Sequence, residues 1–178
     1  MRAGPDVNER LTAASGAVLF LLLAAEGVTI LFIRPLLSAH MFIGMLLIPP
    51  VGLKLGSTGW RFVRYYRGAR AYVEKGPPLL PLRLLAPLVV ASTLAVFGTG
   101  VALLVRGPGG GLLVGLHKAS FVVWLAATGV HVLAYLWRVP RLAAAARASW
   151  LLVAGMVVAG AILAVATIGY GHPWIHTR

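Results

Sequence analysis

The sequence predicts an all-α protein, an integral membrane bundle of five transmembrane helices. Hydrophobic residues make up 60% of its 178 residues and charged residues only 11%, whereas a soluble protein carries about 25% charged residues. Five apolar stretches of roughly 20 residues are each long enough to cross a hydrocarbon core about 30 Å thick. They cover residues 12–33, 36–56, 82–105, 112–136 and 149–169. We therefore expect one transmembrane domain over residues 1–178, with any chemistry located among the helices.

The first span, residues 12–33, follows the N-terminal stretch MRAGPDVNER. Both charge signs occur in this stretch, and no small-residue cleavage motif closes the apolar run after it, so we expect a retained helix rather than a signal peptide. The second span, residues 36–56, contains Pro49 and Pro50. Each proline removes a backbone donor, and we expect the helix to bend there.

A basic aromatic loop, residues 57–81, joins the second and third spans. Its mixture of aromatic rings and basic side chains is typical of the lipid headgroup layer on the cytoplasmic side. The third span, residues 82–105, contains Pro87, and the glycine-rich turn at 106–111 leads into the fourth span, residues 112–136. In the third and fifth spans, four glycines offer small surfaces for close helix approach: Gly98, Gly100, Gly155 and Gly160.

The net charge of +12 is distributed unevenly along the chain. If the helices alternate in direction, one side receives twelve of the sixteen basic residues: Arg2, Arg10, Lys54, Arg61, Arg64, Arg67, Arg70, Lys75, Arg83, Arg138, Arg141 and Arg147. The other side receives Arg34, Arg106, Lys118 and Arg178. The positive-inside rule then predicts a cytoplasmic N-terminus and an extracytoplasmic C-terminus. The charge is thus a topology signal and speaks against nucleic-acid binding, and the excess of Arg over Lys is typical of a GC-rich bacterial genome.

The composition also limits the possible cofactor chemistry. The sequence contains no cysteine, which excludes disulfides, iron–sulfur clusters, thiolate zinc sites and covalent c-type haem attachment. A redox metal in this chain would therefore be held by histidine.

Two spans carry nitrogen donors at the same spacing. In the fourth span, His117 and His131 are fourteen positions apart, so they share a helix face and lie about 21 Å apart along the axis. In the second span, His40 is followed fourteen positions later by Lys54. Because these two spans run in the same direction, we expect His40 to lie level with His117 and Lys54 level with His131. Nitrogen donors at matched depth on two parallel helices can hold a haem edge-on between them.

The stretches LHKASFVVWLAATGVHVLAYLWR and AHMFIGMLLIPPVGLKLGSTGWRFVRYYRG resemble the haem-bearing helices of membrane cytochromes b. The second stretch is also similar to small cytochrome-b-like proteins of actinobacteria, some of which accompany secreted molybdopterin oxidoreductases. The resemblance covers residues 36–137 and implies a haem-binding four-helix core. It implies that His40 and His117 are the axial ligands of an outer haem b, and that His131 is one ligand of a second, inner haem.

Lys54 stands where this pattern has its second histidine. As a neutral amine Lys54 could coordinate the inner iron, and it could instead pair with a haem propionate or extend to the cytoplasmic headgroups. Gly44 lies four residues after His40 on the same face, where the absence of a side chain leaves room for a macrocycle. Phe121 and Trp124 follow His117 on its strip and could pack on a porphyrin, lie between two haems, or serve ordinary helix packing.

Of the four acidic residues in the sequence, Glu26 is the one that falls within a predicted span. Three roles are open to it. It could accept the Nδ1 proton of a ligating imidazole, exchange a proton with a quinone, or remain protonated as a packing residue. His172 and His176 lie in the outer tail, where solvation explains them without a ligand.

Together these observations predict a membrane b-type cytochrome that passes electrons between the quinone pool and a partner oxidoreductase, which we expect to be extracytoplasmic. The resemblance implies an oxidoreductase of the molybdopterin type as one such partner, and another redox partner stays open. Because no substrate-transforming residues are visible, we expect a subunit of an oxidoreductase rather than an enzyme by itself. Two other classes remain open: a transporter or channel with an intramembrane proton path through Glu26, Lys54 and the histidines, and a haem-free anchor. The lack of inverted repeats speaks against the transporter.

Overall fold

The computed structural model describes residues 4–77, 80–137 and 146–176, and the regular structure within these ranges is helical, with no strand. Five of the helices are long and apolar enough to cross a membrane, which indicates a multi-pass membrane protein and confirms the predicted all-α bundle. In chain order the elements are α1 (Pro5–Leu31), α2 (Ile33–Tyr66), α3 (Arg70–Lys75), α4 (Leu80–Arg106), α5 (Gly111–Tyr135), α7 (Arg147–Thr167), the 3-10 helix η1 (Ile168–Gly171) and α8 (His172–His176).

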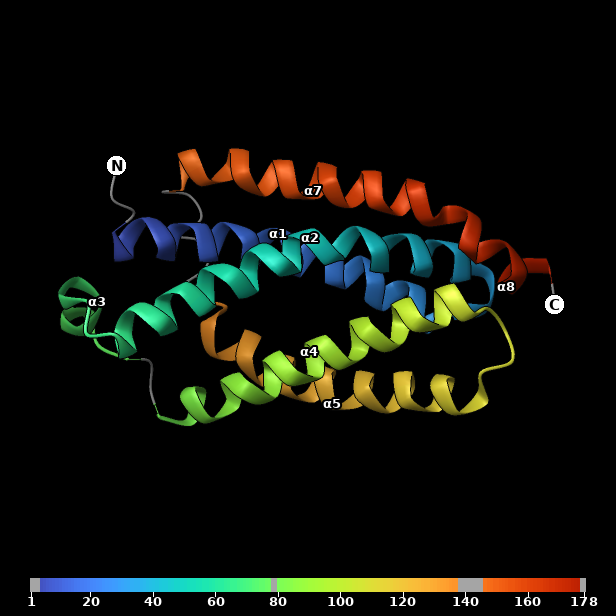
Figure 1. Cartoon of the computed structure of the whole chain (residues 1–178), viewed down its shortest axis with the longest axis horizontal. Helices are drawn as coiled ribbons and strands as arrows, with labels where there is room; N and C mark the ends of the chain where they lie inside the picture. The colour runs from blue at the N-terminus through green and yellow to red at the C-terminus, as the bar shows by residue number, and fades with distance from the viewer. Residues whose placement is uncertain (1–3, 78–79, 138–145, 177–178) are drawn as a thin grey trace.

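The long helices form one elongated bundle (Figure 1). We call the end that carries α3 and the N-terminus the α3 end, and the opposite end, with α8, the α8 end. The chain passes back and forth between these ends, so α2 and α5 run in the same direction, as the sequence predicts. The long helices coincide with the predicted spans, since a hydrophobic run of this length has few alternatives in a chain so poor in charge.

The stretch predicted as a basic aromatic loop, residues 57–81, is largely helical. Helix α2 continues to Tyr66 and ends where Gly68 adopts a positive φ of 71°, a conformation that glycine accepts without steric cost. The short helix α3 ends in the same way at Gly76, with a φ of 76°. Aromatic and basic residues do not interrupt a helix, and Gly59 is itself helical, so α2 continues until Gly68, the first residue of this stretch with a positive φ.

Helix α2 continues through Pro49 and Pro50, and its departure from helical dihedrals lies instead at Leu36, with φ −106° and ψ 18°. Pro50 has no N–H to donate to the carbonyl of Leu46 four residues earlier. That carbonyl oxygen faces Gly160 of α7, because a Cβ atom at Gly160 would overlap it. Here two helix backbones meet without an intervening side chain, the close approach expected of small residues in membrane helices.

The helices divide into two groups. Helices α1, α2 and α7 pack on one another, whereas α5 packs closely against α4. Figure 1 shows α7 and the α4–α5 hairpin on opposite sides of α1 and α2. Small side chains of the first group form its buried cluster, Ala14, Ala146 and Val153, with Leu11, Val18 and Leu53 packed against it.

Side-chain contacts tie each end of the bundle. At the α3 end, Lys75 Nζ donates a hydrogen bond of 2.7 Å to Asp6 Oδ1 and also pairs with Glu9. At the α8 end, the indole N–H of Trp174 donates to the carbonyl of Leu103 at 3.3 Å. The first contact holds α3 against α1, and the second joins the C-terminal segment to the α4–α5 hairpin.

Candidate functional site

Polar side chains from four helices meet in one layer near the α8 end. Glu26 lies near the C-terminus of α1 and His40 near the N-terminus of α2. Thr99 lies in the C-terminal part of α4 and His117 in the N-terminal part of α5. Antiparallel connections bring these helix segments to the same depth, so the layer follows directly from the order of the spans.

The ring of His40 is held by α1. Its Nδ1 lies 2.8 Å from Glu26 Oε1 and 3.2 Å from Thr29 Oγ1. Thr29 already donates its single hydroxyl proton to the Glu26 carbonyl at 2.6 Å, so towards the ring it is an acceptor, and a carboxylate also accepts. With a proton on Nδ1, the His40 ring donates to both acceptors, and neither contact uses Nε2.

The ring of His117 is held by α4 in an equivalent way. Its Nδ1 lies 3.0 Å from Thr99 Oγ1, and Thr99 donates its proton to the Ala95 carbonyl at 2.7 Å. His117 is therefore the donor to Thr99, and its Nε2 carries the lone pair. Gly100 permits this placement, because a Cβ atom there would stand 3.1 Å from His117 Cε1.

The rings of His40 on α2 and His117 on α5 lie beside one another in an edge-type contact. Their centres are 6.3 Å apart, and their planes make an angle of 72°. The structure thus brings together the two histidines that helix spacing places at one depth. Both histidines are partly buried. The side chain of His40 is 21% exposed, and that of its partner Glu26 is 12% exposed.

The sequence leaves three roles open to Glu26, and in one of them its carboxylate accepts the Nδ1 proton of a ligating imidazole. The contact between Glu26 and His40 Nδ1 has the geometry that this role requires. Gly44 lies beside the same carboxyl group, since a Cβ atom at Gly44 would be 3.7 Å from Glu26 Oε1. Gly44 therefore faces α1, and its expected role in leaving room for a macrocycle stays a prediction.

The two aromatic residues that follow His117 stack on each other. The rings of Phe121 and Trp124 have centres 6.1 Å apart and planes inclined by 28°. The indole N–H of Trp124 donates to Thr93 Oγ1 at 3.0 Å, which fixes this ring against α4. The contact accounts for Trp124 as a packing residue between α4 and α5.

Towards the α3 end, each member of the predicted pair of Lys54 and His131 has contacts on its own side of the bundle. Lys54 Nζ donates to the carbonyl of Thr12 in α1 at 2.6 Å. The ring of His131 lies beside Tyr135, with centres 5.0 Å apart, and its Nδ1 is buried without a hydrogen-bond partner among the described residues. Ligation of an inner iron by Lys54 and His131 stays a prediction.

Thr29, Thr99 and Gly100 complete the site, and the sequence alone does not identify them. The sequence feature that could have pointed to these residues is a hydroxyl group or a glycine in an apolar span at the depth of a histidine. Membrane helices contain many such residues, so this feature does not single them out. His172 begins α8 and is exposed. The side chain of His176 and Arg178 lie outside the described part of the chain, as do Arg138 and Arg141 of the predicted basic side.

Within the described ranges, no group of three or more His, Asp or Glu side chains is arranged to hold a metal ion. A macrocyclic cofactor that supplies its own equatorial nitrogens requires no more than two protein ligands, and His40 and His117 are two candidates.

A scan against protein-family models finds no match to the chain. Comparison with curated proteins finds no relative, and comparison with solved structures finds no similar fold. The resemblance to membrane cytochromes b therefore rests on the residues of the second and fourth spans alone.

Proposed function

We propose that the chain is a membrane b-type cytochrome whose haem lies between α2 and α5, with His40 and His117 as axial ligands. The separation of the two rings carries this proposal. An imidazole nitrogen binds a first-row metal ion at about 2.0 Å, and a ring with bonds of about 1.33 Å has its centre about 1.1 Å behind that nitrogen. Two imidazoles on opposite faces of one iron therefore have centres about 6.2 Å apart, and the centres of His40 and His117 are 6.3 Å apart.

The hydrogen bonds of the two rings support the same assignment. A metal-bound histidine almost always donates its other ring N–H to a carboxylate, carbonyl or similar acceptor. His40 donates to Glu26 and His117 donates to Thr99, so in each ring Nε2 remains for a ligand. The close packing of α5 against α4 rather than against α2 is consistent with a cofactor between α2 and α5.

Bound haem would supply a one-electron carrier, and the protein would set the geometry and the electronic character of its ligands. Glu26 and Thr29 fix the orientation of His40, and the carboxylate makes that imidazole a stronger donor. Thr99 fixes His117 through a neutral hydroxyl group, so the two ligands are supported unequally.

We infer further that this haem exchanges electrons with a quinone in the bilayer and with a partner oxidoreductase, of the molybdopterin type that the resemblance implies. The basic residues at the α3 end favour a cytoplasmic N-terminus, which puts His40 and His117 near the outer surface of a bacterial plasma membrane. A second haem at His131 has weaker support, because its Nδ1 lacks an acceptor among the described residues and Lys54 bonds to Thr12.

The test is the haem content of purified variants, measured per chain as the pyridine haemochrome. Replacing either His40 or His117 by alanine is expected to abolish the same haem, whereas His131→Ala spares it. His172→Ala is the matched control, because this exposed histidine lies in α8 outside the site. Full haem content in both ligand variants would overturn the assignment, and a colourless wild-type protein would favour the haem-free transporter or anchor.

A further inference from the structure

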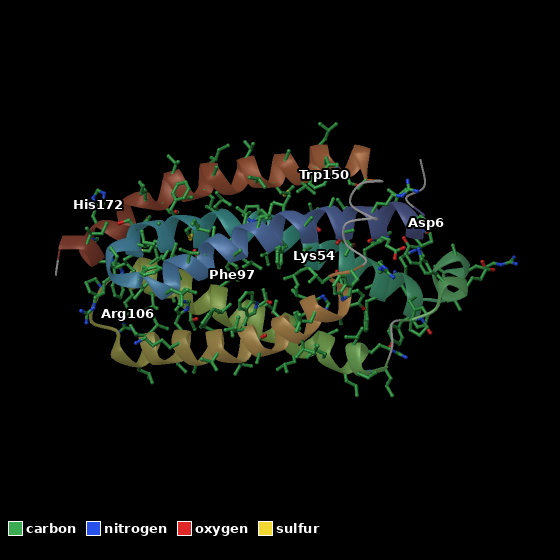
Figure 2. All side chains as sticks on the ribbon, turned by 180° about the vertical axis from the view of Figure 1, so that it is seen from behind. Asp6, Lys54, Phe97, Arg106, Trp150 and His172 are labelled. Atoms are coloured by element: carbon green, nitrogen blue, oxygen red, sulfur yellow. The ribbon has the colours of Figure 1, made fainter. Side chains whose placement is uncertain are left out.

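A basic side chain is seated inside the α3-end half of the bundle. Lys54 is partly buried, and its Nζ bonds to the Thr12 carbonyl at 2.6 Å. Gly16 makes room for the ammonium group, since a Cβ atom there would stand 3.0 Å from Nζ. Figure 2 shows Lys54 on the side of α1 and α2 that faces α5. Lys54 is therefore held against α1 by a backbone hydrogen bond.

Lys54 has no acidic partner among the residues that the structure describes. The ion pairs in these ranges involve other side chains. An ammonium group has three donor protons, and Thr12 accepts one of them. A charge in a membrane span is costly unless it is paired or faces a polar ligand.

Two further polar atoms at this depth lack partners. Thr128 Oγ1 and His131 Nδ1, both on α5, are buried and form no hydrogen bond with any described residue. Buried polar atoms in native proteins are nearly always hydrogen-bonded, so unsatisfied ones call for an explanation. Thr128 and His131 are three residues apart on α5 and so share a helix face, and the helix spacing puts Lys54 of α2 at the depth of His131. The unsatisfied donors of α2 and α5 therefore lie at one level of the bundle.

We propose that Lys54, Thr128 and His131 form a binding site for the anionic oxygen of a membrane-soluble molecule. Each of the three can donate a hydrogen bond, and an oxyanion accepts several at once while it neutralises the ammonium group. Lys54 lies fourteen residues from His40, about 21 Å along the helix, which brings it near the edge of a hydrocarbon core about 30 Å thick.

Two molecules carry such an oxygen at this depth: a phospholipid of the leaflet at the α3 end, through its phosphate, and a second haem, through a propionate. The phospholipid source is independent of the haem between His40 and His117. The propionate source rests on the proposed function.

The experiment compares the purified full-length wild type with Lys54→Met, Lys54→Arg and Thr128→Val. Native mass spectrometry after titration with phosphatidylglycerol measures lipid binding. Diacylglycerol, which has acyl chains but no phosphate, serves as the control lipid, and the pyridine haemochrome measures haem in the same samples. Loss of the lysine charge is expected to weaken retention of the ligand about tenfold or more, whereas Lys54→Arg keeps the charge and most of the binding. Thr128→Val removes one donor without changing the side-chain shape.

Weaker phosphatidylglycerol binding at constant haem content identifies the phospholipid, and loss of one haem equivalent identifies the propionate. The spectrum of the outer haem, or the helical circular dichroism if that haem is absent, shows in each sample that the variant is folded. The test therefore separates failure of this site from failure of the proposed function. If Lys54→Met does not fold, the comparison of Thr128→Val with wild type tests the site in its place. Lipid and haem retention equal to wild type in the folded variants would overturn the proposal.

Discussion

Gly100→Ala tests the placement of His117 with a single added methyl group. A Cβ atom at position 100 would lie 3.1 Å from His117 Cε1 and 3.6 Å from Nδ1, whereas ordinary contact begins at 3.4 Å. The imidazole must therefore move by a few tenths of an ångström, away from Thr99, which it meets at 3.0 Å. Overpacking of this kind costs about 1 kcal/mol or more, which corresponds to about fivefold weaker haem binding.

The assay is transfer of haem from the purified protein to an excess of apomyoglobin, followed by optical spectroscopy. Gly98→Ala is the matched control, because it adds the same methyl group to α4 at a position with nothing within 4 Å. We expect the Gly98→Ala variant to release haem like wild type and the Gly100→Ala variant to release it faster. Equal release from the two variants would refute the packing of His117 against α4.

Three other perturbations address the contact between α7 and α2, the support of His40 by Glu26, and the ion pairs of Lys75 at the α3 end. Gly160→Ala should lower the thermal midpoint, because the added Cβ overlaps a carbonyl of α2, whereas Gly155→Ala has open space around it; similar midpoints would contradict the contact. Glu26→Gln should raise the haem midpoint potential by about 50 mV, since it removes the charge beside a ligand and weakens donation to ferric iron; an unchanged or lower potential in a redox titration would count against that support. Hydrogen bonds that Lys75 donates to the carboxylates of Asp6 and Glu9 raise the pKa of Lys75 above its ordinary value of 10.5, so its contribution to stability is complete below that pH and is lost as the pH rises through the raised pKa. Melts of wild type should lose stability above pH 10.5 more than those of Lys75→Met, and parallel curves would exclude this contribution.

The transmembrane part of the fold is predictable because length and hydrophobicity leave few alternatives to a membrane helix. The extension of α2 to Tyr66 is not predicted, because aromatic and basic residues are typical both of an interfacial loop and of a helix that leaves the membrane. The partner of Gly160 is also not predictable, because it depends on which helices become neighbours. Pro50 gives a partial signal, since it frees the Leu46 carbonyl that meets Gly160.

The pairing of His40 with His117 is predictable because helix pitch and alternating topology fix the depth of each residue. The hydroxyl groups that support these rings are not. Thr29 and Thr99 both bond to carbonyls of their own helices, as most threonines in membrane spans can do, and only the rotation of α1 and α4 decides which of them reach a neighbouring ring. The same freedom explains why Lys54 turns towards Thr12 of α1 although its depth matches that of His131.

Low-temperature electron paramagnetic resonance of the oxidised, purified protein is the sharpest test of a haem held between α2 and α5. The spectrum of a ferric haem with two imidazole ligands depends on the angle between their planes, which is 72° for His40 and His117. We predict a low-spin signal of the strongly anisotropic type that nearly perpendicular imidazoles produce, absent from His40→Ala and His117→Ala. A rhombic signal of nearly parallel imidazoles, a purely high-spin signal, or a protein that takes up no haem would contradict ligation by these two histidines.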